Sequence, residues 1–145
     1  MIRDLVNHLP LMVTPAWVRS RSTPIALADL LACLREVAEL PEASGRILDA
    51  GGPEVVTYEE IMCCYGRLVG RRPRILAVPV LTPRLSSYWL SLVTDVDVTT
   101  GRNLIESMGT EVLVTDTSIR EIVPGEPLDY EEAVRRALEE DGREF

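Results

Sequence analysis

The residue types that most often perform chemistry are scarce in this chain of 145 residues. His8 is the only histidine, all fifteen basic residues are arginine, and lysine is absent. A Schiff-base enzyme and a phosphate-binding P-loop both need a lysine, so the sequence excludes both. One histidine cannot build a multi-histidine zinc site, and a Ser-His-Asp triad would have to use His8, beside which the sequence indicates no convergent carboxylate or serine.

Arginines provide the strongest charge signal. Residues 61–94 contain no Asp or Glu but hold five arginines: Arg67, Arg71, Arg72, Arg74 and Arg84. Because guanidinium groups bind phosphates well, this segment is either an anion-binding site or a solvated face that pairs with the acidic C-terminal helix. Two aromatic features could line a pocket or pack in a core, namely Trp17 beside Arg19 and Tyr88 beside Trp89.

Composition indicates one soluble globular domain over residues 1–145, with 46% hydrophobic and 26% charged residues. The net charge of −8 argues against general nucleic-acid binding. Cys33, Cys63 and Cys64 are odd in number and fall in predicted helices, which favours reduced thiols. With no signal peptide evident, we expect a cytoplasmic protein.

The longest apolar tract, residues 75–93, raises the question of a membrane span. Pro79, Pro83 and Arg84 interrupt it, so we expect instead a strand over 75–78 and a helix capped by Thr82. Leu85, Tyr88, Trp89, Leu92 and Val93 form the apolar face of that helix.

The remaining pattern alternates short strands with helices. It predicts a helix over residues 2–9, an extended stretch over 11–14 and a short strand that ends at Pro24 and Ile25. A helix ended by Pro41 follows, with Asp29 in its first turn and one face formed by Leu30, Cys33, Leu34, Val37 and Ala38. We interpret Asp29 as a stabiliser of the helix terminus rather than as a catalytic acid.

A strand over residues 46–50 should stop at Gly51-Gly52-Pro53, a turn that we expect to use the backbone freedom of glycine. Thr57 and Glu60 form a capping box, and the helix after them should bury Ile61, Met62, Tyr65, Leu68 and Val69 before Gly70 ends it. The C-terminal part predicts a helix over 100–108, a strand over 111–114 and a last helix to about residue 140, which Asp129 and Glu132 cap. The fold class is therefore α/β, with about four short strands and flanking helices, too few for a sheet covered on both faces.

Four segments carry a resemblance to a known family: RSTPIALADL (residues 21–30), GRILDAGGPE (45–54), TYEEIM (57–62) and LTPRLSSYW (81–89). In this order they resemble the C-terminal half of atypical extended short-chain dehydrogenases, which are NAD(P)-binding and similar to nucleoside-diphosphate-sugar epimerases. The resemblance covers nearly the whole chain and implies the C-terminal portion of a Rossmann-type fold.

In that family the N-terminal half supplies a glycine-rich nucleotide turn and a catalytic Tyr-x-x-x-Lys pair. Neither motif occurs here, so the resemblance implies a substrate-binding portion without its cofactor half, not competent for catalysis alone. NAD or NADP is implied only for a full-length relative. The residues expected to enclose a small or anionic substrate against the nicotinamide of a cofactor-bearing partner are Trp17, Arg19, Arg84, Tyr88 and Trp89.

Two other interpretations stay open. The chain could be a non-enzymatic module that covers its apolar surface by forming homo-oligomers, since half of a fold exposes apolar area. It could also be the tail of a complete reductase or epimerase.

Overall fold

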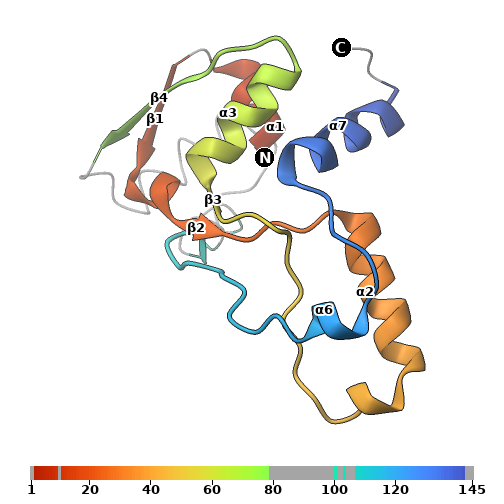
Figure 1. Cartoon of the computed structure of the whole chain (residues 1–145). Coiled ribbons are helices and arrows are strands. Elements are labelled where there is room, and N and C mark those ends of the chain that lie inside the picture. Colours follow the sequence, from red (N-terminus) through yellow and green to blue (C-terminus); the bar gives the residue numbers. More distant parts are fainter. Residues whose placement is uncertain (1, 10, 79–99, 101–102, 104–106, 143–145) are drawn as a thin grey trace. The chain divides into compact units, whose positions relative to one another are not determined.

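The computed structural model describes residues 2–9, 11–78, 100, 103 and 107–142 (Figure 1). The chain forms two compact units. The first comprises the described residues of 1–21 and 57–111, and the second those of 22–56 and 112–144. The unit boundaries fall within β2 (Arg21–Ser22) and β3 (Val56–Thr57).

The first unit pairs two parallel strands and packs helices on one another (Figure 1). β1 (Leu11–Pro15) and β4 (Arg74–Val78) run in register from Leu11 opposite Arg74 to Pro15 opposite Val78. Successive strand residues face opposite sides, so Met12 and Thr14 are buried while Leu11 and Val13 are exposed. The unit also contains α1 (Ile2–His8) and η1 (Ala16–Arg19), both of which contact α3 (Tyr58–Leu68).

Helix α3 is the best-specified element of the first unit. The predicted capping box is confirmed: the Thr57 hydroxyl accepts from the backbone N–H of Glu60 at 3.2 Å, and the Glu60 carboxylate accepts from the backbone N–H of Thr57 at 2.7 Å. Five residues of the helix are buried, Ile61, Met62, Cys64, Tyr65 and Gly66, whereas the predicted core residues Leu68 and Val69 are half-buried. Gly70 follows the helix with a φ of 69°, as expected for a C-terminal glycine.

The second unit contains four helical segments: α2 (Leu27–Glu39), η2 (Pro41–Ala43), α6 (Ile119–Ile122) and α7 (Tyr130–Glu140). The N-terminus of α7 is capped by Asp129, whose carboxylate accepts from the backbone N–H of Glu132 at 2.7 Å. The sequence predicted a second capping box here, with a return hydrogen bond from the Asp129 backbone to Glu132. The Glu132 carboxylate instead accepts from Arg136 Nε at 2.9 Å.

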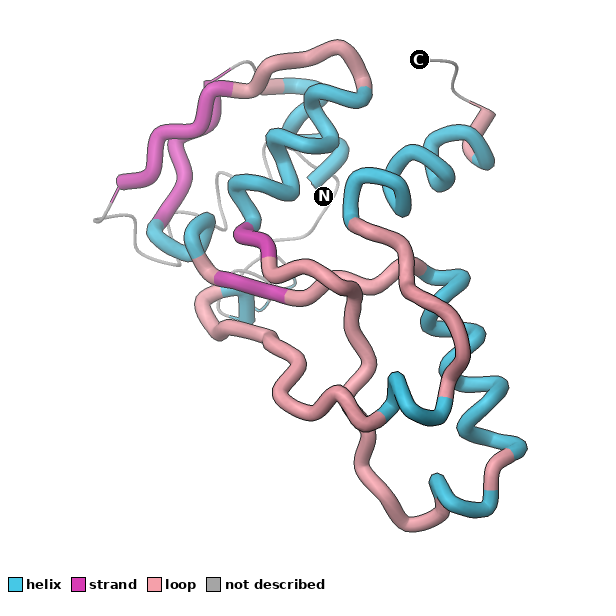
Figure 2. The backbone as a smooth tube through the Cα atoms, viewed as in Figure 1, coloured by secondary structure: helices cyan, strands magenta, loops and turns pink. Residues whose placement is uncertain are grey.

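Three predicted strands are wrong or shorter in the structure. Residues 46–50 are part of a loop (Figure 2), the strand over 111–114 reduces to one bridge between Val112 and Ser22, and β2 ends before Pro24. A strand needs a hydrogen-bonded neighbour along its length, which local β propensity does not supply. Pro24 moreover has no N–H to donate to a ladder.

The predicted end of α2 before Pro41 and the place of Asp29 in its first turn are confirmed, but its predicted apolar face is not a core face. No residue of α2 is buried, and the side chain of Leu34 is 60% exposed. The predicted helix from Thr82 lies outside the described residues, as does most of the predicted helix over 100–108. Within the part of the chain that the structure describes, no helix combines the length and apolarity that crossing a membrane requires.

Candidate functional site

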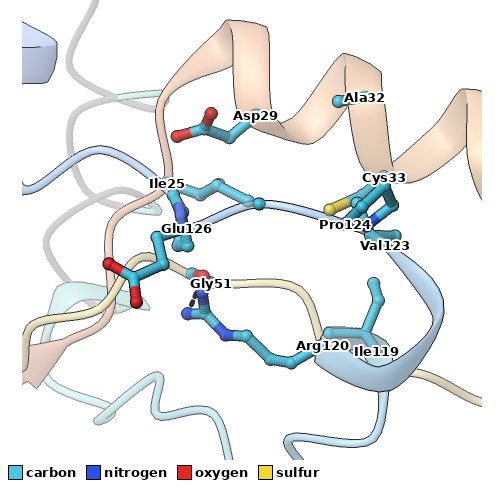
Figure 3. Close-up of a pocket in the computed structure, with 12 residues that line it drawn as sticks. Ile25, Asp29, Ala32, Cys33, Gly51, Ile119, Arg120, Val123, Pro124 and Glu126 are labelled. Carbon is cyan, nitrogen blue, oxygen red and sulfur yellow. Dashed lines mark hydrogen bonds between the residues drawn. The ribbon is translucent and has the colours of Figure 1, made fainter.

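A small pocket opens in the second unit between the first half of α2, α6 and the loop that precedes α7 (Figure 3). Its volume is about 80 Å³. Its lining is Ile25, Asp29, Ala32, Cys33, Gly51, Ile119, Arg120, Val123, Pro124, Gly125, Glu126 and Pro127. Pockets that hold a drug-sized ligand are typically about 300–1,000 Å³, so this one has room for a few atoms rather than for a dinucleotide.

The glycine pair Gly51-Gly52, of which Gly51 lines the pocket, is packed against the chain itself. A Cβ on Gly51 would overlap the Val114 side chain, and one on Gly52 would overlap the carbonyl oxygen of Pro24. The backbone N–H of Gly52 donates to that same Pro24 oxygen at 3.1 Å. Neither glycine has a positive φ, so the expected reason for glycine here, backbone freedom, is wrong, and close approach of backbone replaces it.

Arg120 joins α6 to the glycine turn. One guanidinium nitrogen donates to the carbonyl oxygens of Gly51 at 3.2 Å and Gly52 at 3.3 Å (Figure 3). Two carboxylates, Asp29 and Glu126, also line the pocket. The lining therefore carries charges of both signs, which suits a small polar group better than a phosphate.

Asp29 acts as a tether in the structure. Its Oδ2 accepts from the backbone N–H of Leu128 at 2.8 Å, so the first turn of α2 holds the loop that leads into α7. The carboxylate thus satisfies a backbone donor 99 positions away in sequence. Asp29 was expected to stabilise the terminus of its own helix, and the hydrogen bond that the structure shows goes instead to a distant loop.

A second carboxylate in this unit fixes the loop over residues 46–50. Asp49 Oδ2 accepts from the backbone N–H and the hydroxyl of Thr115, both at 3.0 Å, and from the backbone N–H of Asp116 at 3.2 Å. These hydrogen bonds to the charged form hold the pKa of Asp49 below its ordinary value, with the Thr115 backbone contributing most. Asp49 is therefore a structural anion rather than a group ready to take up a proton at neutral pH.

Two of the five predicted substrate-binding residues are described, and both lie in η1 of the first unit. Trp17 is half-buried and meets the Tyr58 ring edge-to-face, with centroids 5.8 Å apart and planes at 82°. Among the described residues nothing accepts a hydrogen bond from the buried Trp17 Nε1. Arg19 is exposed. The other three, Arg84, Tyr88 and Trp89, lie outside the described residues.

Several residues that line the pocket are not among those that the sequence predicts for a site. Arg120 was not distinguishable from the other arginines, because its partners are carbonyls 68 and 69 positions away. The segment Pro124-Gly125-Glu126-Pro127 did carry a signal, since two prolines and a glycine in four residues indicate a loop. Cys33 was expected on an apolar helix face, and it lines the pocket from α2.

The three cysteines were expected to be reduced, and their surroundings in the structure differ. All three cysteines are free thiols, and burial raises the pKa of Cys63, which makes its thiolate scarcer at neutral pH. Cys64 is buried while Cys63 is half-buried, as expected for neighbours on a helix. In the described ranges, no group of three or more His, Cys, Asp or Glu residues is arranged to hold a metal ion.

Arg71 connects the arginine segment to α1 within the described part of the first unit. Arg71 donates through a guanidinium nitrogen to the backbone carbonyl of Asn7, which lies in α1. Arg72 and Arg74 are exposed. The contact of Arg71 is structural, and Arg84 lies outside the described residues.

These features define a mixed α/β protein with short strands and flanking helices. No family model and no curated protein matches the sequence. Among solved structures, the chain is similar to an NADPH-dependent quinone oxidoreductase (QOR2) from Escherichia coli, with a TM-score of 0.75 and 13% sequence identity. The likeness covers 94% of this chain and 49% of that one, so this chain spans about half the length of the oxidoreductase. At this identity the likeness is one of fold.

Proposed function

We propose that the chain is the substrate-binding portion of an NAD(P)-dependent epimerase- or reductase-like protein, and that a separate cofactor-binding half completes the site. The likeness in fold to an NADPH-dependent oxidoreductase carries the proposal, because it extends over nearly all of this chain but only half of the neighbour. The resemblance of residues 21–30, 45–54, 57–62 and 81–89 to extended short-chain dehydrogenases supports it independently.

The glycine pair Gly51-Gly52 and the small pocket beside it do not form a dinucleotide site. The only adjacent pair of glycines in the sequence, Gly51-Gly52, is filled by Val114 and by the Pro24 carbonyl, so it offers no open cradle for a pyrophosphate. The pocket beside it, at about 80 Å³, is also far smaller than a nicotinamide dinucleotide requires. Cofactor binding is therefore assigned to the other half, and no hydride transfer is assigned to this chain.

On the substrate side, we propose that Trp17, Arg19, Arg84, Tyr88 and Trp89 enclose the ligand. The indole N–H of Trp17 supports this proposal. A buried N–H without an acceptor costs about 1–3 kcal/mol, and a substrate oxygen would supply the acceptor. The neighbour acts on quinones, whose carbonyl oxygens are acceptors of this kind. A small carbonyl compound is therefore the substrate class to test first.

The cofactor part of the proposal is tested by titrating the purified chain with NADH and NADPH, followed by nicotinamide fluorescence and calorimetry. We expect no binding in the micromolar range. Micromolar affinity for either nucleotide would overturn the assignment of the cofactor site to another half, since this chain would then contain a site of its own.

The substrate part is tested by calorimetric titration with a water-soluble quinone. Trp17→Phe keeps the ring but removes the N–H, so we expect about a fivefold to tenfold loss of affinity, equivalent to one hydrogen bond. Arg84→Ala and Trp89→Ala should also weaken binding, whereas Arg35→Gln, on exposed α2, should not. Unchanged affinity in all three site variants would contradict the proposed substrate site.

A further inference from the structure

The pocket of the second unit has a charged end and an apolar end (Figure 3). The carboxylates of Asp29 and Glu126 and the guanidinium of Arg120 lie at one end, and Cys33 and Val123 lie at the other. Arg120 and Glu126 also line an adjoining cleft, so the charged end is the open one. A ligand that fits both ends has a charged head and a short apolar side chain.

The charged groups at this end keep free hydrogen-bonding capacity. Arg120 uses one guanidinium nitrogen for two backbone carbonyl oxygens of the glycine turn, and its other nitrogens have no partner among the described residues. Asp29 accepts from the Leu128 N–H through Oδ2, which leaves Oδ1 free within the described part of the chain. The Glu126 carboxylate has neither a hydrogen bond nor an ion pair with any described residue.

The two signs of charge do not neutralise each other across the pocket. Among the described side chains, no ion pair joins Arg120 to either carboxylate, although all three groups line the same small volume. A phosphate would meet two carboxylates, and a simple cation would leave the arginine unused. A zwitterion satisfies both signs, because its carboxylate accepts from Arg120 while its ammonium group donates to Asp29 and Glu126.

We propose that this pocket binds a small zwitterionic amino acid. The α-carboxylate lies at Arg120, the α-ammonium group lies at Asp29 and Glu126, and the side chain points to the apolar end. A cavity of about 150 Å³ holds benzene, so a volume of about 80 Å³ admits the side chain of alanine but not that of phenylalanine. Every residue of the pocket belongs to the second unit, whereas the described members of the proposed substrate site belong to the first, so the inference does not rest on the proposed function.

Titration of the full chain with L-alanine, followed by NMR of the backbone amides, tests the proposal. We expect saturable shifts at Gly51, Gly125 and Leu128, and none at Gly70 in the first unit. The dissociation constant should be on the order of 1 mM, because so small a ligand makes few contacts. The absence of saturable shifts at about ten times that concentration would overturn the proposal.

The two charges of the ligand are tested one at a time with n-propylamine and propionate. Each compound carries one of the two charges on a short chain, so we expect each to bind at least about tenfold more weakly than L-alanine. If either bound as tightly as L-alanine, the pocket would be a site for a single ion and the assignment to a zwitterion would be wrong. Equal binding of L-phenylalanine would contradict the placement of the side chain in the pocket.

Two pairs of variants locate the ligand in the pocket. Glu126→Gln removes a partner of the ammonium group and should weaken L-alanine binding about fivefold, whereas Glu121→Gln, in the same unit but outside the pocket, should have no effect. Ala32→Leu fills the pocket and should abolish binding, whereas Ala38→Leu makes the same change at an exposed position of α2 and should not. Circular dichroism checks that all four variants keep the helix content of the wild type. Unchanged affinity in both Glu126→Gln and Ala32→Leu would place the ligand elsewhere and overturn the proposal.

Discussion

Helices α2 and α3 are similar in length and both amphipathic, yet their surroundings differ. The 11 residues of α3 include five buried ones and begin at a complete capping box. The 13 residues of α2 include none that is buried and begin after an alanine that cannot cap. Hydrophobic periodicity identifies a helix and its apolar face, but it does not say what covers that face.

The comparison also separates two sources of helix stability. Short helices are marginal in water, and most of their stability comes from packing of the apolar face rather than from propensity. On that basis α3 is held by its contacts with α1 and η1, whereas α2 contacts α6 and η2 and keeps a row of leucines exposed. The predictions below exploit this difference.

The largest expected difference is between two core-type truncations, one in each helix. Met62 is fully buried in α3, so Met62→Ala should lower the free energy of unfolding by about 3 kcal/mol through lost burial and a cavity. Leu31 in α2 is 56% exposed, so Leu31→Ala should cost less than about 1 kcal/mol. Urea unfolding of dilute protein, followed by circular dichroism, gives both values. Equal losses in the two variants would remove the contrast between the helices.

A second large effect is expected at the glycine turn, which is the tightly packed part of the unit that contains α2. Gly52→Ala places a methyl group on the carbonyl oxygen of Pro24, a backbone atom that cannot rotate away. We expect a loss of about 2–3 kcal/mol, as for other overpacked sites. Gly45→Ala provides a different comparison, because Gly45 has open space around its Cβ position but a φ of 74°. Backbone strain at this positive φ should lower the free energy of unfolding of Gly45→Ala by about 1 kcal/mol.

The sequence predicts local features well and long-range ones poorly. The end of α2 before Pro41, the capping box at Thr57 and the helix-ending Gly70 follow from interactions within a few residues, and the structure confirms all three. The prediction of a strand over residues 46–50 was wrong, because a strand depends on a hydrogen-bonded partner that can lie far away in the sequence.

The candidate site shows the same division. Asp29 and Gly51 stand out in the sequence, but the Asp29–Leu128 and Arg120–Gly51 hydrogen bonds join residues 99 and 69 positions apart. No periodicity or local motif encodes such pairs. The predicted substrate residues Trp17 and Arg19 share one short helix, in which the Trp17 ring contacts that of Tyr58.

The capping difference between the helices gives a pair of opposite effects. Thr57→Ala removes the hydroxyl that accepts from Glu60, so we expect a loss of about 1 kcal/mol in unfolding free energy. Ala26→Ser supplies a missing acceptor at a position whose backbone is already extended, with φ −66° and ψ 144°, and should gain up to about 1 kcal/mol. Thermal or urea unfolding measures both. No gain from Ala26→Ser would show that the first turn of α2 already has adequate partners.

The smallest expected effects are on the stability of the protein in acid. They compare one carboxylate from each unit, Asp49 and Glu60. The pKa values of Asp49 and Glu60 are both lowered, in each case chiefly by backbone N–H groups that donate to the carboxylate. A lowered folded pKa adds stability above the unfolded pKa, near 4, and this contribution is lost as the pH falls through the folded value. The stability of the wild type should therefore decline as the pH drops from about 5 to 3.

Asp49→Asn and Glu60→Gln should each flatten that decline, with the variants approaching the wild type in acid and falling below it at neutral pH. Glu42→Gln, an exposed carboxylate in η2, serves as the matched control and should leave the profile unchanged. Unfolding midpoints measured across the acid range give the comparison. If Asp49→Asn alone flattened the profile, the link between residues 49 and 115 would be the dominant acid-sensitive contact, because its carboxylate anchors a loop rather than a helix already held by packing.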